Sequence, residues 1–161
     1  MKRFAGILCL MLILSLLMGC RTPTKAVSCM ELSVEVPMTY LDLSSQDYAE
    51  DLDMMYGDGH VVVAAVRNDR AELESYIEDL TLEGYGELVI EMNELDTGLI
   101  QKDGLWTFSY EADSNGDMFT YVAAVYESDT SFWTVQAYCL TAEYEKYQDT
   151  MWEVVSSAKT N

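Results

Sequence analysis

Apolar and polar residues alternate in the segment ELSVEVP, at positions 31–37. An extended chain places every second residue on the same side, so this period is typical of a strand buried on one face. Pro37 lacks a backbone N–H and ends the pattern. The buried face takes Leu32, Val34 and Val36.

The run VVVAAVR, at positions 61–67, is apolar at every position but the last. A continuous run of this kind predicts a strand that is buried on both faces. The cluster Gly57-Asp58-Gly59 lies just before it and predicts a turn. We therefore expect a hairpin in which the segment 48–56, whose own pattern is ambiguous, forms the other arm.

Two helices are predicted between positions 69 and 94. Asp69 is suited to cap the first, with Glu72 at the capping-box position, and Thr81 is suited to cap the second. Gly84 and Gly86 each weaken the second helix by about 1 kcal/mol relative to alanine. The apolar faces take Leu73, Tyr76, Ile77 and Leu80 in the first helix, and Leu82, Tyr85, Val89 and Met92 in the second.

Three apolar segments rich in aromatic residues follow, at positions 105–112, 117–128 and 131–140. Asn115-Gly116 separates the first two and is a strong signal for a two-residue hairpin turn. Ser128-Asp129-Thr130 separates the second from the third. The three segments are therefore expected to form an antiparallel meander.

A last helix is predicted from Ala142 to about Ala158, with Thr141 as its cap. Because several strands are apolar on both faces, the sheet needs cover on both sides, and the helices are the available covers. The prediction is an α+β fold over residues 30–160, with an antiparallel sheet covered by helices on both faces. The last helix is expected to turn Tyr144, Tyr147, Met151, Val154 or Val155, and Ala158 toward the core.

The order of these elements, with an aromatic strand running into TAEYEKYQDTMWEVVSSAK, resembles the PsbP-like fold. The resemblance covers most of residues 31–158. It implies a sandwich architecture and a binding or accessory role. It carries no catalytic residues across, because one fold hosts many functions.

The first twenty residues have the pattern of an export signal. Lys2 and Arg3 precede an apolar run of about 15 residues, which is short for a spanning helix. The run ends in Leu17-Met18-Gly19-Cys20, which resembles the lipobox of bacterial lipoprotein precursors. The resemblance implies cleavage after residue 19, a lipid on Cys20, and an anchored protein on the extracytoplasmic face of the cell membrane. The alternative is an uncleaved signal anchor in which Cys20 is an ordinary thiol.

Residues 20–29 are expected to form the lipidated terminus and a short polar tether. The net charge of the chain is −19, and loss of Lys2 and Arg3 with the leader makes it two charges more negative. Such a surface argues against nucleic acid, whose phosphates require Lys and Arg. It permits a basic partner or a cation, although solubility alone explains it as well.

Two thiols remain in the expected mature domain, Cys29 and Cys139. In an exported protein two such residues can form a disulfide. Cys139, however, falls on the apolar face of a predicted strand, where a free cysteine packs as a small hydrophobe. Both states stay open from the sequence.

Acidic residues supply the candidate metal sites. Asp113, Asn115 and Asp117 begin a calcium-loop pattern, but Met118 and Ala124 stand where an EF-hand needs Gly and Glu, so an EF-hand is excluded. The hairpin turn explains Asn115 equally well. A stripe of acids on the second helix would meet a basic partner or divalent cations, or form a solvated face. That stripe consists of Glu83, Glu87, Glu91 and Glu94.

His60 is the single histidine, and four acidic residues lie shortly before it in the sequence. Carboxylates and one imidazole could bind a metal, although zinc sites usually have more His or Cys ligands. As a general base it would need a nucleophile close by. No recognised hydrolase, zinc-protease, nucleotide or redox motif is present. The neighbouring acids are Glu50, Asp51, Asp53 and Asp58.

These observations predict a non-catalytic, membrane-anchored binding or accessory module of the cell envelope, without a cofactor. Its expected partners are the membrane, through the lipid on Cys20, and an envelope protein or basic partner. The runner-up is a cation- or solute-binding lipoprotein that uses its acidic surface. A third hypothesis is an enzyme centred on His60.

Overall fold

The computed structural model describes residues 22–46 and 49–161 as two antiparallel sheets and four helical segments. The predicted signal peptide, Cys20 and Arg21 lie outside the described residues. The larger sheet has the order β3 (Leu41–Asp42), β4 (Met54–Gly57), β5 (Val61–Asp69), β9 (Ser131–Leu140), β8 (Asp117–Glu127), β7 (Leu105–Ser114) and β6 (Ile100–Lys102). The smaller has the order β1 (Thr24–Cys29), β2 (Leu32–Pro37) and β10 (Lys159–Thr160). The helical segments are α2 (Arg70–Glu74), α3 (Leu82–Met92), the 3-10 turn η2 (Thr141–Glu143) and α4 (Tyr144–Ser156).

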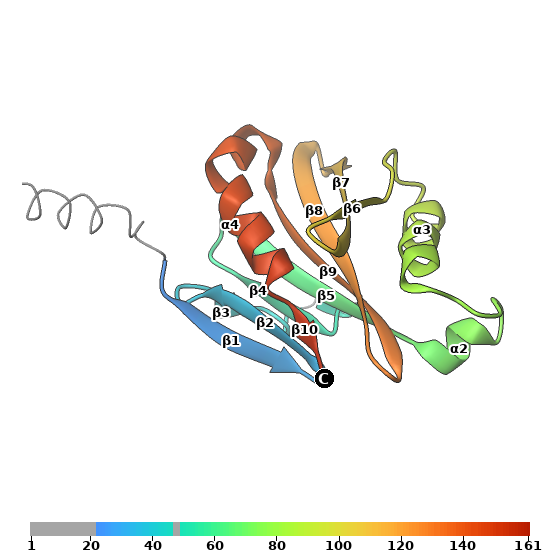
Figure 1. Ribbon diagram of the computed structural model, residues 1–161. Coiled ribbons are helices and arrows are strands. Elements are labelled where there is room, and N and C mark those ends of the chain that lie inside the picture. Colours follow the sequence, from blue (N-terminus) through green and yellow to red (C-terminus); the bar gives the residue numbers. More distant parts are fainter. Residues whose placement is uncertain (1–21, 47–48) are drawn as a thin grey trace, which may run out of the picture.

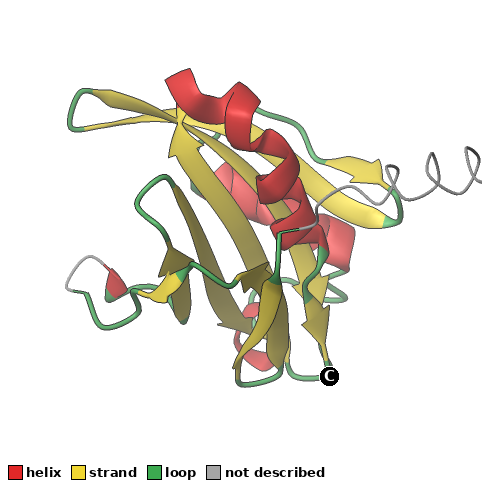
Figure 2. Cartoon of the chain, turned by 90° about the vertical axis from the view of Figure 1, so that its left-hand side faces the viewer, coloured by secondary structure: helices red, strands yellow, loops and turns green. Residues whose placement is uncertain are grey.

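The seven-stranded sheet is covered on both faces, as predicted. Helix α4 and the three-stranded sheet lie on one side, and α3 lies on the other (Figure 1). The view turned by 90° places α4 in front of the strands and a second helix behind them (Figure 2). The α+β class with an antiparallel sheet is therefore confirmed. Among the described residues, no helix is both long enough and apolar enough to cross a membrane.

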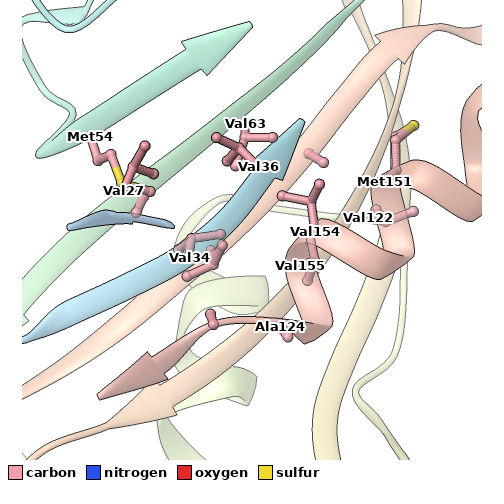
Figure 3. Close-up of a cluster of buried hydrophobic side chains, with 14 of the residues drawn as sticks. Val27, Val34, Val36, Met54, Val63, Val122, Ala124, Met151, Val154 and Val155 are labelled. Atoms are coloured by element: carbon pink, nitrogen blue, oxygen red, sulfur yellow. The ribbon is translucent and has the colours of Figure 1, made fainter. Parts of the chain in front are cut away.

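Strand β8 explains why both faces need cover. Its successive residues point to opposite sides, so Val122 and Ala124 join the core under α4 while Ala123 and Val125 join the core under α3. All four are fully buried. The side chains between β2, β4, β5, β8 and α4 are drawn in Figure 3. Among the described residues, every buried core residue lies between Val27 and Ala158.

The predicted turns are confirmed. Asn115 and Gly116 both have positive φ, +56° and +91°, as a type I′ hairpin turn requires. Strands β4 and β5 form the expected hairpin, with Met54 opposite Ala65 and Gly57 opposite Val62. Short turns of the predicted composition thus fix the register on both sides of the sheet.

The first helix is shorter than the pattern predicts. Asp69 caps α2 by accepting from the backbone N–H groups of Ala71 and Glu72, but α2 ends at Glu74. The Ser75 hydroxyl donates to the Glu72 carbonyl and takes up an acceptor at the helix end. Tyr76 is 83% exposed, so the prediction that it faces the core is wrong.

The second helix follows the prediction closely. Thr81 caps α3 by accepting from the N–H of Gly84. Tyr85 is buried, whereas Met92, at the end of the predicted apolar face, is 73% exposed. Gly86 has a packing reason that the sequence does not reveal. A Cβ atom there would lie 2.7 Å from a methyl group of Leu99.

The expected tether is the largest error. Residues 24–29 form strand β1, which pairs with β2 along its whole length. The strand is edge-located and mostly exposed, with Val27 as its one core residue, so its sequence lacks an apolar pattern. Strands β6 and β10 were missed because they have only three and two residues.

Thr141 does not cap the last helix. Its hydroxyl accepts a hydrogen bond from Thr120 over 2.9 Å, and a 3-10 turn comes between it and α4. The predicted core face of α4 is nevertheless confirmed. Met151, Val154, Val155 and Ala158 are buried, and Tyr144 and Tyr147 pack against them.

Candidate functional site

A pocket of about 340 Å³ lies between α3 and the sheet face beneath it. We call it the α3 pocket. Strands β5, β7 and β9 supply its floor, and α3 with the loop after it supplies a wall. The lining residues are Val66, Asn68, Leu73, Tyr85, Leu88, Val89, Met92, Asn93, Leu95, Phe108, Tyr110, Thr134 and Gln136.

One end of the floor is a hydrogen-bonded chain of three side chains. The amide nitrogen of Asn68 donates to the hydroxyl of Tyr85 over 2.9 Å. That hydroxyl lies 3.0 Å from the hydroxyl of Thr134. Tyr85 is 1% exposed, and its burial raises the pKa of its hydroxyl. A neutral tyrosine thus joins α3 to strands β5 and β9.

The other end of the floor is the pair Tyr110 and Gln136. The Tyr110 hydroxyl donates to the side-chain oxygen of Gln136 over 3.1 Å. Burial raises the pKa of Tyr110, so this hydroxyl also stays protonated at neutral pH. The ring of Tyr110 stacks on Tyr121 at 4.6 Å between centroids, and Tyr121 stacks on Tyr138 at 4.8 Å. A row of tyrosines therefore extends the floor across β7, β8 and β9.

A second hollow of about 370 Å³ continues the α3 pocket toward the segment between α2 and α3. The two share Asn68, Leu73, Leu88 and Met92. The outer hollow adds Tyr76 and Ile77, and Tyr76 is well exposed. Exposed apolar side chains thus surround the mouth of a pocket with a polar floor.

Among the described residues that line the α3 pocket, none has a charged side chain. The outer hollow includes Asp69, which caps α2, and Glu72. Glu83, Glu87 and Glu91 lie exposed on α3, as a solvated face would. Glu94 lies beyond the end of α3 and has a φ of +52°, so the four acids do not form one helical stripe.

The side chain of His60 contacts Glu143, and not one of the acids that precede it in the sequence. Its Nδ1 lies 3.3 Å from Oε2 of Glu143, and its ring stacks on Tyr147 at 5.6 Å. Asp58 accepts from the backbone N–H of His60 and shapes the turn.

The remaining acids of that group lie elsewhere. Asp53 accepts from the backbone N–H of Arg67 at the other end of the β4–β5 hairpin. Glu50 and Asp51 are exposed in the segment before β4, and neither has a recorded contact with His60. The antiparallel register separates His60 from Asp53, so the acids that precede His60 in the sequence do not gather around its ring.

The calcium-loop candidates lie at a hairpin tip. Asp113 accepts a hydrogen bond from the N–H of Gly116 over 3.3 Å, so its carboxylate stabilises the turn. Asn115 occupies the turn itself, and Asp117 begins β8. Within residues 22–46 and 49–161, no three His, Cys, Asp or Glu side chains gather in a metal-binding arrangement.

Cys29 and Cys139 are free thiols in the structure. Cys139 is fully buried, as the strand pattern predicts, and Cys29 donates to the carbonyl oxygen of Asp53 over 3.3 Å. Burial raises the pKa of both thiols. Both cysteines therefore act as packing residues.

Sequence reasoning missed the α3 pocket altogether. The available signals were the polar residues Asn68, Thr134 and Gln136 within otherwise apolar strands, together with an α3 face that ends in Met92. A polar residue on a buried strand face requires a partner or a hollow. The signal becomes specific only when the register brings the three residues onto one face.

Comparison with models of known protein families finds no match, and no curated protein matches the sequence. Solved structures do match. The solution structure of cyanobacterial PsbP (CyanoP) from Synechocystis sp. PCC 6803 has a TM-score of 0.55 at 9% identity, over 89% of this chain and 96% of that one. The Ran-binding protein Mog1p of Saccharomyces cerevisiae has a TM-score of 0.56 at 11% identity, over 87% of this chain and 96% of that one. At such identities the likeness concerns the fold alone, and the chain has the PsbP-like fold that its element order predicts.

Proposed function

We propose that this chain is a non-catalytic binding module, held by a lipid on Cys20 at the extracytoplasmic face of the cell membrane, and that the α3 pocket is its binding site. The lipobox resemblance at residues 17–20 supports the anchor. The binding role has support from the fold, which Mog1p, described as a Ran-binding protein, shares.

The composition of the α3 pocket is the observation that carries the proposal. Its apolar walls end on a floor of amide and hydroxyl groups, which is the usual make-up of a small-molecule site. The described residues of the lining include no His, Cys, Ser, Lys, Asp or Glu, so none of them places a base beside the hydroxyls of Thr134 and Tyr85. Such a pocket is built to bind rather than to react.

Site-specific photocrosslinking tests the proposed site. A photoreactive phenylalanine analogue replaces Met92, at the mouth of the pocket, or Met30, which lies in the β1–β2 turn of the other sheet. The two methionines are similarly exposed, at 73% and 69%, so Met30 is a matched control. After irradiation of the producing cells, the mass of the purified protein reports any adduct.

We expect a discrete adduct from position 92 and none from position 30. Equal labelling at both positions, or none at either, would contradict a binding role for the α3 pocket. Neither result depends on whether Cys20 carries a lipid.

A further inference from the structure

We infer that the α3 pocket selects an uncharged small molecule with a compact apolar body and one hydrogen-bonding group. The inference rests on the proposed binding function of the pocket and adds the chemical class of the ligand. Four features of the site lead to it: its size, its walls, its lack of charge and two open hydrogen-bonding positions.

The volume sets the size of the ligand. At about 340 Å³ the pocket is near the lower end of the range of about 300–1,000 Å³ for small-molecule sites. The outer hollow of about 370 Å³ continues it past Met92 and Leu88. A body of one or two rings fits the inner part, while a larger ligand would extend along Tyr76 in the outer part.

The walls are apolar and adaptable. Val66 and Phe108 face the pocket from the sheet, and Leu88, Val89 and Met92 face it from α3. Burying the apolar surface of a ligand against these side chains stabilises the complex. The flexible thioether of Met92 can adjust to different ring shapes.

The lack of cationic side chains in the described lining disfavours anionic ligands. A buried carboxylate or sulfonate needs a paired cation, and no Lys or Arg is among the described residues that line the α3 pocket or the outer hollow. Arg70, whose guanidinium lies 4.2 Å from the ring of Phe132, is already paired with Glu127 over 2.9 Å. The exposed acids Glu87 and Glu91 on α3 would further repel an anion.

A cation is disfavoured by the same reasoning. Within residues 22–46 and 49–161, no carboxylate lines the inner pocket, so these residues offer no counter-charge to a cation bound against Thr134 or Gln136. A neutral ligand carries neither of these desolvation costs.

Two polar positions remain open on the floor. Gln136 uses its oxygen to accept from Tyr110, and Asn68 uses its nitrogen to donate to Tyr85. The amide nitrogen of Gln136 and the amide oxygen of Asn68 form no hydrogen bond with any described residue. The floor thus offers one donor and one acceptor, which suits an amide, a hydroxyl or an aromatic amine on the ligand.

Two fluorescent probes with the same ring system test the charge selection. N-phenyl-1-naphthylamine is neutral, and 8-anilinonaphthalene-1-sulfonate adds one sulfonate to it. Both are titrated into residues 20–161 carrying Cys20→Ser, a form that retains every core residue of the part of the chain that the structure describes. We expect saturable binding of the neutral probe and at least tenfold weaker binding of the sulfonate.

The variants Val66→Phe and Val62→Phe locate the binding. Both residues are half-buried on β5, and only Val66 lines the pocket. Val66→Phe should weaken binding of the neutral probe at least tenfold, while Val62→Phe should leave it within twofold. An unchanged affinity in Val66→Phe would overturn the inference.

The variants Met92→Lys and Met30→Lys test the charge argument without touching the core. Each adds one positive charge at an exposed position, but only residue 92 lies at the pocket. Met92→Lys should tighten binding of the sulfonate several-fold, and Met30→Lys should not. If the wild-type protein binds the sulfonate as tightly as the neutral probe, and Val66→Phe abolishes both, the selection for uncharged ligands is refuted while the pocket remains the site.

Discussion

The indole N–H of Trp133 donates to the carboxylate of Glu31 over 3.3 Å, and this contact joins the two sheets. Glu31 lies in the turn between β1 and β2, while Trp133 lies in β9. The same carboxylate oxygen accepts from the guanidinium of Arg67 over 3.1 Å and from the hydroxyl of Ser131. A single carboxylate therefore ties the small sheet to the large one.

Replacing Glu31 with Gln should destabilise the fold. The variant loses charge-assisted hydrogen bonds and leaves Arg67 with only the longer contact to Asp69, at 3.8 Å, which costs about 1.5–3 kcal/mol. Urea unfolding at pH 7 measures this. Glu35→Gln is the control, because Glu35 is exposed and uses only backbone atoms in its hydrogen bonds. A loss for Glu31→Gln no larger than that for Glu35→Gln would contradict the role of this carboxylate.

The contribution of Glu31 should depend on pH. The hydrogen bond from Ser131 is the largest cause that lowers the pKa of Glu31, to about 2 from an ordinary value of 4.5. A lowered pKa in the folded state means that the stabilisation is complete above pH 4.5 and is lost as the pH falls toward 2. The difference in unfolding free energy between wild type and Glu31→Gln should shrink over that range. A difference that stays constant down to pH 2.5 would show that the carboxylate is not the source.

The two glycines of α3 should respond in opposite directions to replacement by alanine. A Cβ at Gly84 meets its neighbours at an ordinary 3.4 Å, so Gly84→Ala should stabilise the protein by about 0.5–1 kcal/mol through helix propensity. A Cβ at Gly86 would lie 2.7 Å from Leu99, so Gly86→Ala should destabilise it by about 1–3 kcal/mol. The melting temperatures of the Gly84→Ala and Gly86→Ala variants, each compared with wild type, test this prediction. Equal shifts in the two variants would argue against the close contact of α3 with Leu99.

The lipid anchor is tested at Cys20. Cys20→Ser should abolish incorporation of a fatty-acid analogue and leave an uncleaved precursor, whereas Cys29→Ser should be labelled normally because Cys29 belongs to β1. The readouts are metabolic labelling and intact mass. Continued labelling of the Cys20→Ser protein would refute the anchor.

The domain boundary should lie before β1. A chain that begins at Thr22 keeps the six residue pairs between β1 and β2 and should unfold cooperatively. A chain that begins at Ser28 loses Val27 and most of that pairing, so its melting temperature should fall by several degrees. If both chains melt at the same temperature, β1 contributes nothing to the stability of the domain.

The sequence was sufficient where local chemistry decides the structure. The pair Asn115-Gly116 strongly favours one kind of hairpin turn. Strands β5, β8 and β9 are apolar on both faces, so the sheet must be covered on both sides. These features predicted the meander, the last helix and the α+β class. The helix caps Asp69 and Thr81 were found for the same reason.

The remaining features depend on contacts between residues far apart in the chain. Strand β1 exists because β2 offers it an edge, although its own composition is polar. The α3 pocket appears only when the register places Asn68, Thr134 and Gln136 under Tyr85 and Leu88. No local sequence pattern predicts these long-range contacts. The contacts of Glu31 with Arg67, Ser131 and Trp133 could not be predicted from the sequence for the same reason.

The strand order has a consequence for how the chain folds. Strands β3, β4 and β5 follow one another along the chain, as do β6, β7, β8 and β9, so each set can form through local connections. Most of these are short hairpin turns, and the longest, between β3 and β4, takes residues 43–53. Joining the two sets requires β5 to meet β9 across the long stretch that holds α2 and α3, and closing that loop costs chain entropy. Arg67 and Trp133 face each other across this seam, and both bind Glu31. The Glu31 carboxylate thus stabilises the pairing of β5 with β9, which closes the longest loop between neighbouring strands of the large sheet.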